Sequence, residues 1–129
     1  MTQWIGLKEL ITEEKTENNA NNQTMADIKT ALEVGSSKEL GRYFDKTVKL
    51  NLRDENGAFS ASQAQILLRN FFEKYQAKGF EYIHQGAIKD GNRYLIGKYE
   101  YNKGVFRVYI QLKGKSEEAT IHSILFSDY

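Results

Sequence analysis

Two histidines, His84 and His122, are the side chains of this chain best suited to moving a proton near neutral pH. The unperturbed pKa of imidazole lies close to neutrality, which suits it to general acid–base catalysis. His84 stands in the segment FEYIHQG, where strand alternation predicts that it shares a face with Phe80 and Tyr82. His122 stands in ATIHSILF, and alternation alone does not assign it to the core face or the solvent face.

Other kinds of chemistry find little support in the sequence. The absence of cysteine excludes disulfides, thiolate metal sites and cysteine nucleophiles. Two separate histidines are a weak basis for a metal site, which needs clustered ligands. No glycine-rich phosphate loop, serine elbow or zinc-helix signature is present. We therefore expect neither a metal nor a cofactor.

The composition is that of one globular domain whose basic and acidic residues are nearly equal in number. With 129 residues and an apolar fraction of 40%, the chain can build a proper core. Lys plus Arg number 18 against 17 Asp plus Glu, a balance that argues against nucleic-acid binding. No apolar run approaches the length of a membrane span, and the first residues lack the basic start and apolar core of a secretory signal.

One long helix, expected over residues 60–78, is the element around which the other elements must be organised. Ser60 is suited to the N-cap position, and Gly79 to the position just after the end. Apolar residues recur at steps of three and four and form a broad stripe: Ala64, Leu67, Leu68, Phe71, Phe72 and Tyr75. The segments that follow must bury this stripe.

The chain before the long helix divides into an N-terminal segment and the start of the domain. Residues 1–24 combine an amphipathic stretch with an Asn-rich linker, and a docking helix, a cap on the protein's own core and an artificial extension all remain open. From residue 25 onward we expect two short helices, with capping boxes at Thr24 and Ser36, and then a half-buried strand over residues 48–52.

After Gly79 the pattern predicts only strands joined by short turns, which makes an antiparallel meander. In the strand near residues 105–113, one face is wholly apolar and must meet the core. The opposite face of the meander is mixed, because it is too aromatic for plain solvent exposure and too charged for a core. Its residues include Tyr94, Ile96, Arg107 and Tyr109. Such a face is often a subunit interface, although an ordinary solvated sheet face is the equal alternative.

Several segments carry a resemblance to a known superfamily. The stretch ALEVGSSKELGRYFDKTVKLNL and the later segments FEYIHQGAIKDG and FRVYIQLK resemble the nuclear transport factor 2-like, or cystatin-like, superfamily. Residues from about 25 to 126 resemble, more narrowly, a small bacterial family of unknown function. The resemblance implies an α+β cone over residues 25–129, in which a curved antiparallel sheet wraps one long helix. It also implies an exported, periplasmic location.

The same resemblance implies a pocket between the helices and the concave sheet face. There His84 would handle a proton, and Tyr43 and Tyr99 would donate hydrogen bonds to a ligand oxygen. Relatives with isomerase activity use a pair of carboxyl groups, and no such pair stands out here. We therefore predict a non-catalytic module that binds a small apolar or amphipathic ligand or a protein, and that dimerises through the mixed face. The alternative is an isomerase- or cyclase-like enzyme in which His84 transfers the proton.

Overall fold

The structure of the chain is a computed structural model that describes residues 23–88, 91–114 and 119–129. The segment predicted at residues 1–24 therefore lies almost wholly outside the described residues. Helical residues run from 23 to 34, and two further helices follow: α2 (Ser37–Gly41) and α3 (Ala61–Lys74). The strands are β1 (Phe44–Asn51), β2 (Asn56–Ser60), β3 (Ala77–Ala87), β4 (Arg93–Tyr101), β5 (Gly104–Lys113) and β6 (Thr120–Asp128).

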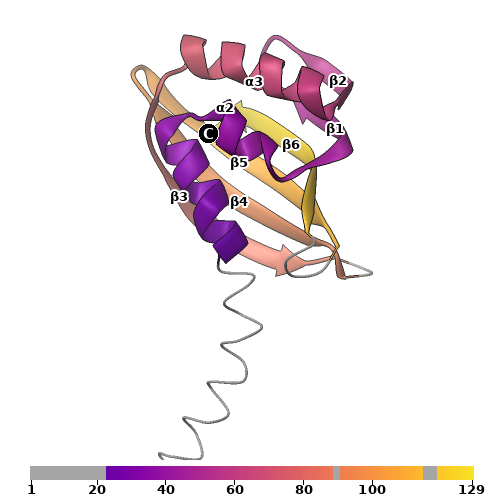
Figure 1. Cartoon of the computed structure of the whole chain (residues 1–129). Coiled ribbons are helices and arrows are strands. Elements are labelled where there is room, and N and C mark those ends of the chain that lie inside the picture. Colours follow the sequence, from indigo (N-terminus) through magenta and orange to yellow (C-terminus); the bar gives the residue numbers. More distant parts are fainter. Residues whose placement is uncertain (1–22, 89–90, 115–118) are drawn as a thin grey trace, which may run out of the picture.

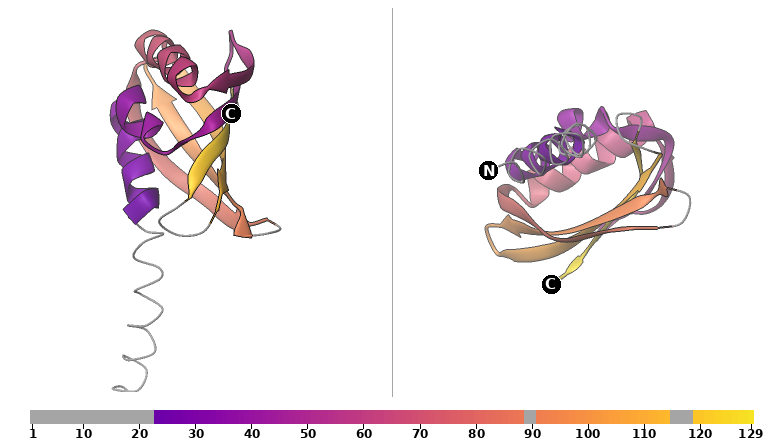
Figure 2. Two further views of the ribbon diagram at one scale, coloured as in Figure 1. Left: turned by 45° about the vertical axis from the view of Figure 1, so that its right-hand side comes forward. Right: turned by 90° about the horizontal axis from the view of Figure 1, so that it is seen from below.

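The strands form one six-stranded sheet in the order β2-β1-β6-β5-β4-β3. The helices lie against one face of this sheet, and no helix of the described residues lies on the other face (Figures 1 and 2). These features confirm the predicted α+β fold with a curved sheet and helices. The expectation of a purely antiparallel sheet was wrong at one pair, because β1 and β6 are parallel. The two strands lie far apart in the sequence, so no turn pattern between neighbouring segments could indicate their pairing.

Side-chain caps fix the starts of α2 and α3 where the sequence predicts them. The hydroxyl of Ser36 accepts a hydrogen bond from the backbone N–H of Glu39 at 3.2 Å, and that of Ser60 accepts one from Gln63 at 3.3 Å. Each bond satisfies a backbone donor that has no partner inside the first turn of its helix. The predicted caps at Ser36 and Ser60 are therefore confirmed, whereas the predicted cap at Thr24 was wrong, because Thr24 already lies within helical residues 23–34.

The end of α3 differs from the prediction. The helix stops at Lys74, and the chain enters β3 at Ala77 instead of continuing to residue 78. Tyr75 leaves the helical conformation with φ −119° and ψ 74°, and its carbonyl accepts a hydrogen bond from the Tyr99 hydroxyl at 2.5 Å. Ala77 is paired with Tyr101 of β4. Contacts with the sheet thus end the helix about one turn before the predicted end at residue 78.

Aromatic rings fill the space between α3 and the sheet. The ring of Phe71 lies 4.5 Å from that of Phe126 and 5.5 Å from that of Phe106, measured between centroids. Phe72 stacks on Tyr99 at 5.7 Å, and Tyr99 is fully buried. Side chains of this size bury much apolar area, so this aromatic cluster is the centre of the core.

Candidate functional site

A β-bulge in β3 decides where His84 points. Tyr82 is opposite Gly97 of β4, whereas His84 is opposite Ile96, so Ile83 is the extra residue. One extra residue shifts the alternation of side chains by one position. His84 therefore lies on the face of the sheet that carries no helix. The prediction that it shares a face with Phe80 and Tyr82 was wrong for this reason.

On that helix-free side, which we call the outer face, His84 joins a row of aromatic and amide side chains. Its Nε2 atom lies 2.9 Å from the Tyr94 hydroxyl, and the Tyr94 ring stacks on the Tyr109 ring with centroids 5.8 Å apart. The side chain of Gln111 donates a hydrogen bond to the Tyr109 hydroxyl at 3.3 Å. The row crosses β3, β4 and β5.

The outer face has an uncharged centre and a charged rim. Next to the aromatic row, Ile96, Tyr109 and Leu125 lie opposite one another on β4, β5 and β6. Beyond them Lys98 is paired with Arg107 across the same strands. The four residues predicted as an interface thus lie on one face, as alternation indicates. Leu125 was not predicted, because the register of β6 shifts between Ile121 and Ser123 and the sequence alone did not assign the residues after that shift to a face.

A shallow groove continues the outer face across the other half of the sheet. Its volume is about 390 Å³, and it lies over β6, β1 and β2. Side chains and backbone of Asn51, Asn56, Ser123 and Leu125 are among its lining. Leu125 belongs to both the groove and the uncharged centre. The outer face is therefore continuous from one edge strand to the other.

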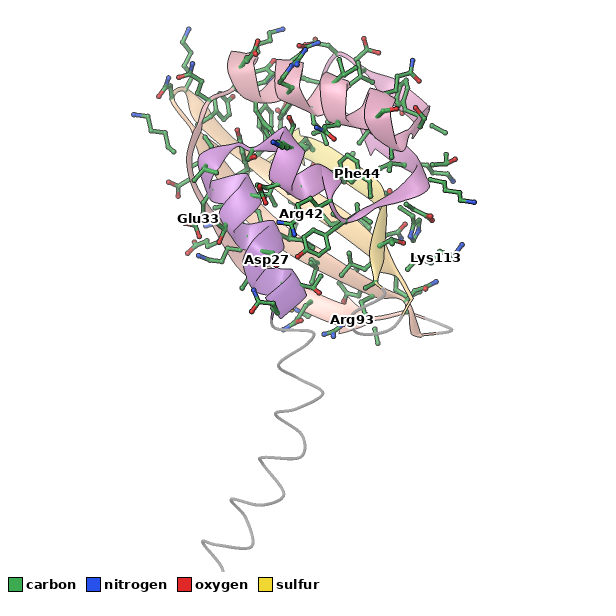
Figure 3. All side chains as sticks on the ribbon, in the orientation of Figure 1. Asp27, Glu33, Arg42, Phe44, Arg93 and Lys113 are labelled. Carbon is green, nitrogen blue, oxygen red and sulfur yellow. The ribbon has the colours of Figure 1, made fainter. Side chains whose placement is uncertain are left out.

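Tyr43 lies away from the outer face. Its hydroxyl donates a hydrogen bond to Asp27. Asp27 lies on the helix formed by residues 23–34 (Figure 3). Burial and this bond raise the pKa of Tyr43 to about 12. The hydrogen bond ties the first helix to the chain just after α2, so its evident role is to fix that helix on the sheet.

Tyr99 occupies a third place, in the middle of the aromatic core. It is fully buried, and its hydroxyl is bonded to the Tyr75 carbonyl. The structure therefore does not bring His84, Tyr43 and Tyr99 together: one is on the outer face, one at a helix contact and one in the core. A ligand role for each of them stays a prediction.

High pH is expected to weaken the fold through the buried tyrosines. The pKa of Tyr43 is raised from 10.0 to about 12, and burial also raises the pKa values of Tyr82 and Tyr99. The unfolded chain then loses these protons first, so the stability they contribute is complete below about pH 10 and is lost as the pH rises through the folded pKa values. Urea unfolding across this range measures the slope. Tyr43→Phe should make it shallower, and an unchanged slope would contradict the assignment.

His122 lies beside the bulge of β6, where β1 and β6 lose regular register. Burial lowers its pKa, and its Nδ1 atom is buried without a hydrogen-bond partner among the described residues. Within residues 23–88, 91–114 and 119–129, no group of three metal-binding side chains gathers around it or elsewhere. The same part of the chain contains no helix with the length and apolarity needed to span a bilayer.

Comparison with known proteins gives a family and a fold. Residues 25–127 match the family described as "Domain of unknown function (DUF4783)". A crystal structure of a DUF4783 family protein from Bacteroides ovatus is 31% identical, with a TM-score of 0.74 over 81% of this chain and 94% of that one. No curated protein matches the sequence.

Two more distant structures show the fold alone. A domain of unknown function with a cystatin-like fold from Nostoc punctiforme is 11% identical, with a TM-score of 0.64 over 88% of this chain and 78% of that one. A structure named "Rd1NTF2_04 with long sheet" is 14% identical, with a TM-score of 0.65 over 82% of this chain and 98% of that one. The predicted membership of a family of unknown function is confirmed, and the fold is similar to that of nuclear transport factor 2-like and cystatin-like structures.

Proposed function

We propose that this chain, which belongs to the DUF4783 family, is a non-catalytic module that associates with a second copy of itself through the outer face of its sheet. The observation that carries the proposal is the face itself, where Tyr94, Ile96, Tyr109 and Leu125 lie side by side and none of the described helices covers them (Figure 2). Aromatic and aliphatic side chains gathered on an open sheet face are typical of association surfaces.

The arrangement of charge favours a second copy as the occupant. Lys98 and Arg107 lie at one border of the uncharged centre, and Glu81 is opposite Lys98 on β3. Glu100 follows on the same face of β4. A symmetric dimer needs a self-complementary surface. Because the rim carries both positive and negative side chains, each copy can place its acidic groups against the basic groups of the other. The uncharged centre can then be buried without leaving an unpaired charge.

Rigid, preformed rings lower the cost of association. The Tyr94 and Tyr109 rings already stack on each other, and the Tyr94 hydroxyl already contacts His84. Side chains held in place before binding lose less conformational entropy when they are buried in an interface. The aromatic row therefore fits the role of an anchor at the centre of the contact.

Tyr109→Glu is expected to convert the dimer into a monomer. A charge at the centre of the uncharged patch would be buried against its own copy, which costs several kcal/mol per unpaired ion. Sedimentation equilibrium or native mass spectrometry should give twice 14.9 kDa for the natural chain and 14.9 kDa for the variant.

The matched control is Ile66→Glu, which puts the same charge on an exposed position of α3 away from the sheet. It should leave the dimer intact. A natural chain that sediments as a monomer at micromolar concentrations would overturn the proposal, and so would a Tyr109→Glu variant that stays dimeric.

Proton transfer by His84 inside the cone finds no specific support. The bulge at Ile83 turns the imidazole to the outer face, and its hydrogen-bond contact is the Tyr94 hydroxyl. The interior that such a reaction would need is occupied by Phe71, Phe72 and Tyr99. These observations favour an association role for His84 over the alternative of an isomerase- or cyclase-like enzyme.

A further inference from the structure

A cleft of about 410 Å³ lies at the C-terminal end of α3, away from the centre of the outer face. Three separate parts of the chain build it: the loop after β1, the end of α3 and the turn between β4 and β5. The residues that matter here are Arg53, Lys74, Tyr75, Tyr101, Asn102 and Lys103. Its volume lies within the range of small-molecule sites, roughly 300–1,000 Å³.

The lining of the cleft carries positive charge from each of the three parts. Arg53, Lys74 and Lys103 all line it, and none of the lining residues in the described part of the chain is acidic. Lys74 forms an ion pair with Asp54 at 2.8 Å, and Arg53 forms one with Asp128 at 3.5 Å. All four of these side chains are about half exposed or more, and exposed ion pairs contribute little stability. The cations therefore remain available to an anion that enters the cleft.

Aromatic rings form the wall against which these cations are held. The rings of Tyr75 and Tyr101 meet edge to face at 5.3 Å, and Tyr101 stacks on Phe106 at 4.7 Å. The Arg53 guanidinium lies 5.8 Å from the centre of the Phe106 ring, and the Lys74 ammonium 5.5 Å from that of Tyr75. The cleft thus combines an aromatic wall with positively charged side chains.

We propose that this cleft binds a small planar aromatic carboxylate. The ring of such a ligand would pack on Tyr75 and Tyr101, since aromatic rings attract one another in offset or edge-to-face arrangements. Its carboxylate would reach the guanidinium of Arg53 and the ammonium of Lys103, which form charge-assisted hydrogen bonds. Asn102 also lines the cleft, and its side-chain amide would supply a further donor.

The test is calorimetric titration of the full chain with 2-naphthoate, with 2-naphthamide and acetate as comparison ligands. Naphthoate should bind saturably, and the neutral amide about tenfold more weakly or worse, because it cannot accept charge-assisted hydrogen bonds from the cations of the cleft. Acetate, which lacks the ring, should also bind weakly. The affinity for naphthoate should fall with added salt.

Variants separate this site from the rest of the surface. Arg53→Gln and Lys103→Gln should each weaken naphthoate binding about tenfold. Arg69→Gln, an exposed cation on α3 outside the cleft, is the matched control and should leave the affinity unchanged. Thermal melts would show that the variants are folded. Tyr109→Glu should bind naphthoate normally whether or not it is monomeric, so the two proposals fail independently.

Three results would overturn the inference: no saturable binding of naphthoate, equal binding of naphthoate and naphthamide, or an affinity that Arg53→Gln and Arg69→Gln change equally. Selective binding of naphthoate that is lost in Arg53→Gln and kept in Arg69→Gln would establish the cleft as an aromatic carboxylate site.

Discussion

Phe71→Ala is expected to lower the free energy of unfolding by about 3–5 kcal/mol, the range for truncating a large aromatic side chain in a core. Phe71 is 5% exposed, and its ring contacts the rings of Phe72, Tyr75, Tyr99, Phe106 and Phe126. Those neighbours are held by α3 and by three different strands. They cannot move together into the space left by the ring, so a cavity would remain.

Urea unfolding followed by circular dichroism measures this loss. Ile66→Ala is the control, because Ile66 lies on the same helix and is 50% exposed. Its effect should stay within roughly 0.5 kcal/mol, as is usual for surface substitutions. A loss below about 1 kcal/mol for Phe71→Ala would mean that the aromatic cluster is not the centre of the core.

The sequence predicted α3 because its apolar stripe and its N-cap act locally. Ser60 caps the helix, and Phe71 and Phe72 face the core as the spacing indicates. The end of the helix could not be predicted from local residue types in the same way. Residues 76–78 are compatible with a helix, and only the pairing of Ala77 with Tyr101 and the bond to the Tyr75 carbonyl draw them into the sheet.

The outer face shows which side-chain positions the alternation along a strand can predict and which it cannot. Tyr94, Ile96, Arg107 and Tyr109 were placed on one face because β4 and β5 pair without interruption. His84 was placed on the wrong face because a bulge at Ile83 leaves no clear signal in the residue types around it. A bulge is set by the neighbouring strand and by the packing below it, which a single strand does not reveal.

The basic cleft was not predicted, and its construction explains why. Arg53, Lys74 and Lys103 are isolated cations in the sequence, separated by 20 residues or more. They meet because β1 and the β4–β5 turn both end beside the C-terminus of α3. No local sequence pattern predicts that these three cations lie close together, because their proximity depends on the order of the strands in the sheet.

The outer face and the cleft are two separate surfaces of the molecule. Leu125 and Tyr109 lie at the centre of the one, and Tyr75 and Tyr101 form the wall of the other. Phe106 and Val108 alternate with Arg107 and Tyr109 along β5, so one strand supports the core and the outer face at the same time. A dimer formed through the outer face would leave the cleft of each copy open.

Gly97→Ala is expected to destabilise the protein by about 1–3 kcal/mol, the usual cost of overpacking a core. A Cβ atom at this position would lie 2.3 Å from the Phe80 ring and 2.8 Å from the backbone carbonyl oxygen of Glu81. Phe80 is 6% exposed and packs edge to face on Tyr82 at 5.2 Å. Neither the ring nor the strand backbone can move freely. Gly97 thus leaves room for Phe80 to lie flat over β4, next to the bulge that turns His84 outward.

Gly79→Ala is the control on the neighbouring strand, because the nearest atom to its added Cβ is a carboxylate oxygen of Glu100 at 3.8 Å. Its free energy of unfolding should change by less than about 1 kcal/mol. Combining Gly97→Ala with Phe80→Leu separates the two clashes. If the ring is the main obstacle, Gly97→Ala should cost less in the Phe80→Leu background, since substitutions in contact are not additive. An unchanged cost there would assign the effect to the Glu81 carbonyl, and a Gly97→Ala variant as stable as Gly79→Ala would contradict the close packing itself.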